Sequence, residues 1–298
     1  MLSGIPIPKD AVRPSETVLV NITPQETRVA VLEENNICEL HIERNSGHSL
    51  VGNIYLGVVK RVLPGMQSAF IDIGLERAAF LHIVDVLEQR RNPDETQRIE
   101  HMLFEGQSVL VQVIKDPINT KGARLSTQIS LAGRFLVHLP QEDHIGISQR
   151  IEDDAERSNL RERLNNLLPE NACHGYIIRT NAENASDDQL QSDINYLTKV
   201  WEHIQKQAKI QPPETLLYQD LPLSLRVLRD MFSLDTHKIL VDSTENHRRM
   251  TQFAEQYVQG ALGRIELFKG ERPLFETHNI EQEIARALQP RVNLNFGS

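Results

Sequence analysis

The sequence has 298 residues, a length that predicts two or three compact domains rather than one. Hydrophobic residues make up 40% and charged residues 24% of the chain, which is the composition of a globular protein and excludes large-scale disorder. The net charge of −9 excludes a protein that coats nucleic acid through a generally basic surface, so any nucleic-acid site must be a local groove.

The sequence contains no sign of export or membrane insertion. Residues 1–15 hold several prolines but no apolar run of signal-peptide length, and no membrane-length apolar run occurs elsewhere. Cys38 and Cys173 are far apart and lack metal-ligand spacing, which is typical of buried thiols in a reducing compartment. We therefore expect a flexible N-terminal extension on a cytoplasmic protein without a membrane segment.

The first part of the chain is rich in β-branched residues separated by turn residues such as Pro24 and Pro64-Gly65. This pattern predicts strands at 18–22, 27–32, 37–42, 53–62, 68–73, 78–82 and 108–115. The later strands turn sharply within a short span and favour a small barrel, and the OB-fold is the commonest such barrel that binds oligonucleotides.

From residue 133 onward, helical and strand patterns alternate. Leucines at helical spacing predict a helix over 153–168, and Ser186 is placed to cap a long second helix. Pro212-Pro213 is typical of a domain junction. The remaining pattern predicts strands near 176–179, 216, 238–241 and 264–268, and helices near 223–232, 245–259 and 280–288.

Phe70 and Phe80 lie in the predicted barrel of a chain that is only 5% aromatic. Exposed aromatic rings in such barrels stack on nucleobases, each base contributing about 1–3 kcal/mol. Nearby positive charge would come from Lys60, Arg61, Arg77 and Lys121. The alternative is that both rings belong to the core, and composition alone favours that alternative.

Arg179-Thr180 ends a predicted strand and precedes a turn-rich segment at 181–186. A guanidinium, a hydroxyl and free backbone amides together suit a phosphate group. Without further context, the pair is more often a surface arginine followed by a turn threonine.

The acidic residues do not assemble a metal site in the sequence. Asp242 follows a predicted strand, but the first strand carries Asn21 where a nuclease sheet would carry an acid. A cap or turn role for Asp242 is favoured. The least favoured hypothesis is a private metal site of Asp72, Asp242 and Glu245.

Several blocks resemble the ribonuclease E/G family, and they occur in the family's order from residue 18 to 298. They are Gly52-Asn-Ile-Tyr-Leu-Gly57, Arg61-Val-Leu-Pro-Gly-Met-Gln-Ser-Ala-Phe-Ile-Asp-Ile-Gly74, Ala79-Phe-Leu-His82, Lys121-Gly-Ala-Arg-Leu-Ser-Thr127, Ser148-Gln-Arg-Ile-Glu152 and Ile178-Arg-Thr180.

The resemblance implies a role for each matching residue. Phe70, Phe80 and Lys121 match the family's RNA contacts in the barrel. The residues that match its 5′-monophosphate pocket are Gly133, Val137, Arg179 and Thr180.

The resemblance also implies a multi-domain α+β fold, in which an RNase H-like unit is interrupted by an OB-fold barrel and a small α/β 5′-sensor domain. The expected divisions are 1–15 for the extension, 16–50 and 213–280 for the RNase H-like unit, 51–126 for the barrel, 127–212 for the sensor, and 281–298 for the start of a catalytic module.

The implied function is part of an Mg²⁺-dependent endoribonuclease that acts on single-stranded, 5′-monophosphorylated RNA in rRNA maturation and mRNA decay, as a homodimer when complete. The family's metal-binding aspartates are missing from these 298 residues, so we expect this chain to bind RNA weakly, to bind no Mg²⁺ specifically and not to cut RNA. The alternative is a stand-alone, non-catalytic RNA-binding or regulatory protein.

Overall fold

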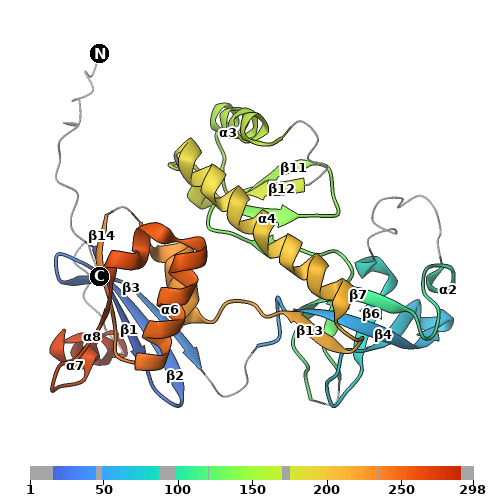
Figure 1. Ribbon diagram of the computed structural model, residues 1–298, viewed down its shortest axis with the longest axis horizontal. Coiled ribbons are helices and arrows are strands. Elements are labelled where there is room, and N and C mark those ends of the chain that lie inside the picture. The colour runs from blue at the N-terminus through green and yellow to red at the C-terminus, as the bar shows by residue number, and fades with distance from the viewer. Residues whose placement is uncertain are drawn as a thin grey trace. The chain divides into compact units, whose positions relative to one another are not determined.

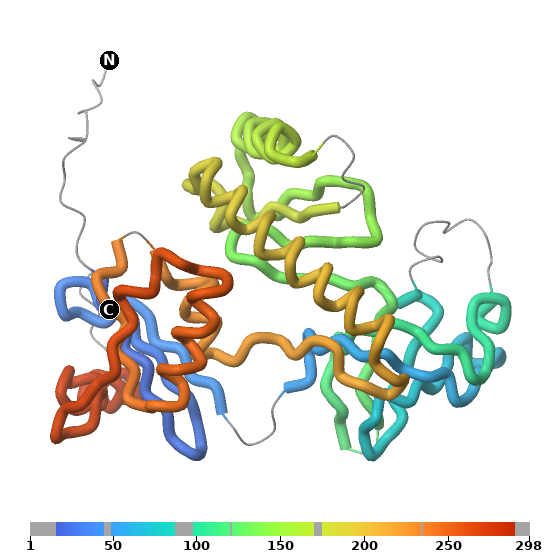
Figure 2. Tube along the Cα trace, in the orientation of Figure 1, coloured from blue at the N-terminus to red at the C-terminus, as the bar shows by residue number. Residues whose placement is uncertain are grey.

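The computed structural model describes residues 16–44, 49–86, 98–119, 121–169, 175–233 and 235–289. The fold is mixed α+β, and the chain divides into two compact units. Unit 1 combines the described parts of 1–48 and 221–298, and unit 2 is formed by the described parts of 49–220. Figure 2 shows the consequence, because the blue beginning and the red end of the trace share unit 1. The predicted extension at 1–15 and Cys173 lie outside the described residues.

Unit 1 is built on a five-stranded sheet with the order β15-β14-β1-β2-β3. Its strands are β1 (Glu16–Ile22), β2 (Glu26–Glu33), β3 (Asn36–Arg44), β14 (Thr236–Val241) and β15 (Ile265–Leu267). The first three form an antiparallel meander, whereas β14 is parallel to both β1 and β15. The sheet therefore joins two segments of the chain that are about two hundred residues apart, a separation set by the inserted unit 2.

Helices and helical turns complete unit 1. They are α5 (Leu223–Arg226), the π turn η4 (Val227–Met231), α6 (Thr244–Tyr257), the 3₁₀ segment η5 (Gln259–Arg264), α7 (Leu274–Thr277) and α8 (Ile280–Ala287). Leu19 and Ala30 of the sheet pack with Phe275 and Ile280 in one buried cluster. These side chains are fully removed from water, which is worth about 1.5–3 kcal/mol for each large one.

The prediction that Cys38 is buried is wrong, because the structure places this thiol on the exposed side of β3. β3 is the last strand of the sheet, so a neighbouring strand covers only one of its edges. Partial burial nevertheless raises the pKa of the Cys38 thiol.

The barrel of unit 2 contains β4 (Ile54–Leu63), β5 (Ser68–Asp72), β6 (Ala79–His82), β7 (Ser108–Lys115) and β8 (Arg124–Ser126). Their order is β4-β5-β6-β8-β7, and an additional pairing of β7 with β4 closes the ring. β13 (Thr215–Tyr218) pairs with β4 from outside the ring. The strand that follows Pro212-Pro213 thus belongs to the sheet of the barrel. The closed five-stranded barrel confirms the predicted small barrel.

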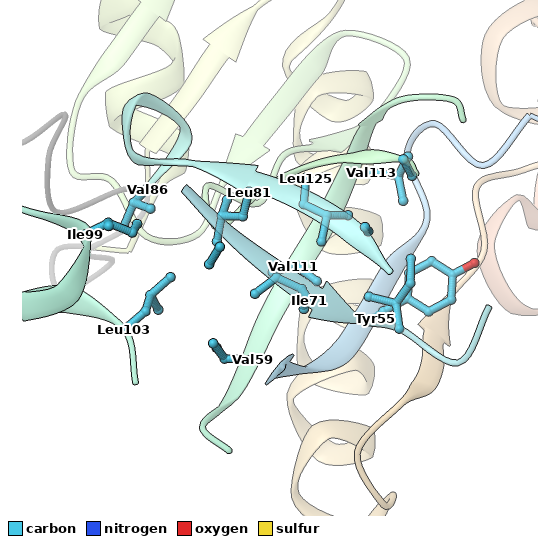
Figure 3. Packing of buried hydrophobic residues seen from close by; sticks show 14 of the residues in the cluster. Tyr55, Val59, Ile71, Leu81, Val86, Ile99, Leu103, Val111, Val113 and Leu125 are labelled. Carbon is cyan, nitrogen blue, oxygen red and sulfur yellow. The ribbon is translucent and has the colours of Figure 1, made fainter. Parts of the chain in front are cut away.

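Alternation along Ala69–Asp72 of β5 and along β6 decides which side chains fill the barrel. Ala69 and Ile71 of β5, and Ala79 and Leu81 of β6, are completely buried. Figure 3 shows the barrel cluster, in which Leu81, Ile71 and Leu125 converge on the interior. Since successive side chains of a strand point to opposite faces, the residues between them must lie on the outer surface.

Short elements border the barrel: η1 (Pro64–Met66), η2 (Ile83–Asp85) and α2 (Ile99–Met102). Gly122 lets the chain pass close to the start of β6, because a Cβ at this position would lie 2.0 Å from the Ala78 carbonyl oxygen. The backbone geometry of the β7–β8 connection therefore depends on glycine here.

The rest of unit 2 is a small α/β layer. Its sheet has the order β11-β12-β10-β9, with β9 (Leu131–Ala132), β10 (Leu136–Leu139), β11 (Ile145–Ile147) and β12 (Gly175–Ile178). The helices are α3 (Asp154–Leu167), η3 (Thr180–Ala182) and α4 (Asp187–Ile210). In Figure 1, the long α4 lies against this sheet and reaches β13 with its C-terminal end.

The predicted cap of the long helix is confirmed. The Ser186 hydroxyl accepts from the backbone of Gln189, and the Gln189 side chain accepts from the backbone of Ser186. The buried side of α4 then carries Leu190, Ile194 and Leu197 at helical spacing. Among the described residues, no helix is both long and apolar enough to span a bilayer.

Candidate functional site

Phe70 and Phe80 lie side by side on the outer surface of the barrel. They are directly opposite each other on β5 and β6, with ring centroids 6.2 Å apart in an edge-to-face arrangement. Both are partly exposed, whereas their neighbours Ala69 and Leu81 are completely buried. The two rings are therefore not part of the barrel core. His82 adds a third ring next to Phe80, at 6.3 Å.

The four cations expected near these rings differ in their partners. Lys60 binds Glu214 at 2.7 Å and Asp72 at 3.3 Å, and the hydrogen bond to Glu214 raises the pKa of Lys60. Arg77 donates to the Asn119 carbonyl oxygen. Arg61 is exposed and stands directly opposite Phe70. Lys121 is exposed in the β7–β8 connection, where its backbone bridges Ile118.

Arg124 is a further cation beside the rings, and it did not appear among the predicted site residues. It pairs with Phe80 across β6 and β8. Its guanidinium binds the buried carboxylate of Asp85, with Nε and Nη2 at 2.8 and 2.7 Å from the same oxygen. The Lys121-Gly-Ala-Arg run contained this residue, but a buried partner 39 positions earlier leaves no local trace in the sequence.

A second cluster surrounds Arg179, which follows β12. Its backbone amide donates to the Phe135 carbonyl oxygen at 2.8 Å, and its Nη1 donates to the carbonyl oxygens of Gly133 and Arg134. Arg179 is partly exposed, and Thr180 beside it begins η3. The arginine is thus held by the backbone of the β9–β10 turn.

That turn is held in place by Asp193 of α4. The buried carboxylate accepts from the backbone amides of Arg134, Phe135 and Leu136 at 3.0, 2.8 and 2.8 Å. Gly133 is required here, because a Cβ would lie 2.5 Å from both carboxylate oxygens of Asp193. A carboxylate that accepts three amides in a buried place rigidifies the segment that carries them.

The structure brings together three of the four residues predicted for an anion pocket. Gly133 contacts Arg179 directly, and Thr180 is its chain neighbour. Val137 lies in β10, where it pairs with Ile177 of β12 and Ala132 of β9. The backbone amide of Gly133 donates to the Leu136 carbonyl oxygen within the turn.

The carboxyl end of the parallel strands in unit 1 carries a network of polar side chains. Asp242 accepts from Asn21 Nδ2 at 2.6 Å and from the Ile22 amide at 2.9 Å. Asn21 Oδ1 accepts from Arg28, which also binds Glu281 at 2.7 Å. The side chain that caps α6 is Ser243, so the predicted cap role of Asp242 is replaced by a clamp on the end of β1.

No cluster of three or more His, Cys, Asp or Glu side chains suited to a metal occurs within the described ranges. Of the hypothetical private site, Asp72 is paired with Lys60 and also accepts from the Gly74 amide. Asp242 is committed to Asn21 and Ile22. These residues do not form a metal centre with one another in the part of the chain that is described.

The model of the ribonuclease E/G family matches residues 130–298. Ribonuclease G of Haemophilus influenzae is 40% identical over 287 residues, and ribonuclease G of Escherichia coli K12 is 41% identical over the same length. Both alignments cover 94% of this chain. Ribonuclease E of a Nostoc species is 38% identical over 282 residues, which is 93% of this chain.

The chain is shorter than these relatives. It spans 58% of the length of either ribonuclease G and 40% of the Nostoc ribonuclease E. The similarity extends over nearly all of the chain. It includes the barrel and the small α/β layer of unit 2 and the sheet of unit 1.

Proposed function

The chain belongs to the ribonuclease E/G family, and from this premise we propose that it binds single-stranded RNA on the outer face of its barrel and recognises a 5′-monophosphate beside Arg179. The observation that carries the proposal is the pair of partly exposed rings, Phe70 and Phe80, on adjacent strands. A folded domain gains little from two neighbouring aromatic rings in water unless a ligand covers them.

The chemistry of the barrel face fits an unpaired strand. Nucleobases have apolar faces that stack on aromatic rings, and their phosphates attract positively charged side chains on the same face. Bases that are paired in a duplex do not expose these faces. The net charge of −9 argues against a diffuse electrostatic surface, so stacking contributes a large share of the affinity.

The test is a fluorescence-anisotropy titration with a single-stranded oligoribonucleotide and with the same strand in a duplex. We expect the single strand to bind more tightly, and Phe80→Ala to weaken its binding by roughly fivefold to a hundredfold. Phe104→Ala is the matched control, because Phe104 is 67% exposed in the connection between α2 and β7 and belongs to neither β5 nor β6. Equal losses in the two variants would contradict a stacking site.

The 5′-phosphate part of the proposal is supported by the Arg179 cluster. Asp193 rigidifies the β9–β10 turn, and this turn orients the Arg179 guanidinium through two carbonyl oxygens. Preorganisation of this kind lowers the entropic cost of binding a compact anion. Thr180, the next residue in the chain, carries a hydroxyl that can serve as a further donor.

For this part, the measured quantity is the ratio of affinities for 5′-monophosphate and 5′-hydroxyl RNA of one sequence. Arg179→Gln is expected to reduce the ratio by about tenfold, the value of a charge-assisted hydrogen bond. Arg150→Gln serves as the control, because Arg150 is exposed in the same layer outside the cluster. A ratio near one for the unmodified protein would contradict phosphate recognition.

The remaining parts of the proposal concern a whole protein of the relatives' length. They are hydrolysis of phosphodiester bonds with Mg²⁺, assembly as a homodimer, and action on rRNA precursors and mRNA in the cytoplasm. We also assign the sheet of unit 1 to an RNase H-like unit, and this assignment is supported by its antiparallel meander followed by two parallel strands. The closed barrel is correspondingly assigned to the OB-fold.

A further inference from the structure

The strand register places one continuous row of side chains across the outer face of the barrel. Arg61 of β4 is opposite Phe70 of β5, Phe70 is opposite Phe80 of β6, and Phe80 is opposite Arg124 of β8. The four residues come from four different strands and follow one another without a gap. Two aromatic rings are therefore flanked by an arginine on either side.

The direction of the row follows from the geometry of a sheet. Neighbouring strands are about 4.8 Å apart, so the two arginines are separated by three strand spacings, or about 14 Å along the surface. The row runs across the strands rather than along them. All four side chains are on the outer face, because Val62, Ala69, Leu81 and Leu125 next to them pack in the core. For Arg61, a register shift between Val59 and Arg61 makes this possible although Val59 is also buried.

The two arginines are available to a ligand in different ways. Arg61 is exposed, and its side chain forms no hydrogen bond or ion pair in the described part of the chain. Arg124 is held in place by Asp85, whose side chain is only 4% exposed. Asp85 is itself held in the fold, since its carbonyl oxygen accepts from Ser126 Oγ and the Thr127 amide, each at 3.0 Å. Its contact with Arg124 uses Nε and Nη2, so Nη1 is not part of this ion pair.

An acidic group on the same face as Phe70 is compensated. Asp72 lies two residues after Phe70 on the same face of β5, where an unpaired carboxylate would repel a phosphate. Lys60 binds both Asp72 and Glu214, so it compensates the negative charge of these two carboxylates beside the row. The row itself carries two positive charges and no acid other than the buried Asp85.

We infer that this row is the path of the RNA: a single strand crosses the barrel perpendicular to β5 and β6, two consecutive bases stack on Phe70 and Phe80, and the phosphates on either side bind Arg61 and Arg124. The inference rests on the proposed RNA binding and adds to it the direction of the strand, a footprint of about four nucleotides and two cationic residues. Asp85 is a positioning residue that aims Arg124.

The experiment measures the binding of a labelled 5′-hydroxyl oligouridylate of about 8 nucleotides at several salt concentrations. A 5′-hydroxyl ligand keeps the Arg179 cluster out of the measurement. Arg61→Gln is expected to lower the affinity by about threefold to tenfold. It should also reduce the slope of log K against log salt by about 0.7, the value for one phosphate of a single strand.

Arg124 needs a variant that does not leave a buried charge unpaired. In the double variant Asp85→Asn plus Arg124→Gln, two neutral amides replace the ion pair, and its melting temperature is measured beside the wild type. The same losses in affinity and slope are expected as for Arg61→Gln. Arg161→Gln on α3 is the control, because Arg161 is equally exposed and lies outside the row, so its affinity and slope should equal those of the wild type.

The outcomes separate this inference from the proposed function. If Phe80→Ala loses RNA affinity while Arg61→Gln and the folded double variant keep the wild-type affinity and slope, the path across the row is overturned and RNA binding stands. If Arg61→Gln and Arg161→Gln lose affinity equally, the charge effect is diffuse and the path is also overturned. If the wild-type protein binds no single strand, both are overturned.

Discussion

The outer face of the barrel and the carboxyl end of the sheet in unit 1 both gather residues capable of chemistry, but only the first is open. In unit 1, the donors of Asn21 and Arg28 are taken up by Asp242 and Glu281. On the barrel, Phe70 and Phe80 contact each other and still leave part of their surface in water.

The two regions differ in whether their polar and aromatic side chains bind one another or remain exposed. The carboxyl end of parallel strands is a common place for ligands in α/β proteins. Here a chain of internal hydrogen bonds fills it, and these bonds join β1, β2, β14 and α8. Polar residues there stabilise unit 1, whereas the barrel keeps its side chains available for a partner.

The largest effect is expected when both aromatic rings of the outer barrel face are removed. The double variant Phe70→Ala plus Phe80→Ala should lower single-strand RNA affinity by roughly 30-fold or more, because two stacking platforms are lost. Unfolding free energy in urea should fall by less than about 2 kcal/mol, since both rings are only partly buried. A large loss of stability instead would show that the rings serve the fold, and the comparison would break.

The reverse pattern is expected for the closed region. Asp242→Ala leaves Asn21 Nδ2 and the Ile22 amide without their acceptor, which should cost roughly 2–4 kcal/mol of stability in urea unfolding. RNA affinity at low temperature should remain unchanged. Glu245→Ala is the control: its ion pair with Arg249 is exposed and is worth less than about 1 kcal/mol. Loss of RNA affinity in Asp242→Ala would contradict a purely structural role.

The Arg179 cluster is intermediate between the two regions, since an internal clamp supports a partly exposed arginine. Gly133→Ala should cost about 1–3 kcal/mol, because the new Cβ would displace the Asp193 carboxylate. It should also reduce the preference for 5′-monophosphate RNA. Gly65→Ala is the matched control, because a Cβ added there would have no other atom within 4 Å. An unchanged preference in Gly133→Ala would separate the clamp from the pocket.

The smallest expected effect is a pH dependence confined to unit 1. Burial and then the nearby Lys238 lower the pKa of His278 from its ordinary value of 6.5. Between the lowered pKa and about pH 6.5, the unfolded chain binds a proton that the folded chain does not. Stability is therefore complete above this pH and decreases as the pH falls through the lowered pKa. Urea unfolding of His278→Gln should lack this part of the slope; an unchanged slope would assign it to other groups.

Much of the fold could be predicted from local patterns. The strands of the meander and of β4 to β7 were expected within one or two residues of their observed bounds, and so were α3, α6 and the start of α4. The short elements β8, β9, β10, β11, α2 and α7 were missed, because two to four residues carry too little periodicity to show. The helix expected at 223–232 is divided into α5 and a π turn.

The candidate site was predictable in its residue types but not in its arrangement. Phe70 and Phe80 drew notice because aromatic residues are scarce, yet the sequence alone favoured placing them in the core. Arg124 was not predicted as a site residue, because its position beside Phe80 depends on its ion pair with Asp85 and on the parallel pairing of β6 with β8. In the sequence, Asp193 is one position of a predicted helix, although its carboxylate holds the β9–β10 turn.

By itself the sequence determined the local elements, the capped long helix and the family, because each depends on neighbouring residues or on several matching blocks in order. Only the tertiary structure decided that β7 closes on β4, that two rings face outward, and that Arg61, Phe70, Phe80 and Arg124 share one row. The physical reason is register: one residue of slip between strands would turn every side chain to the opposite face.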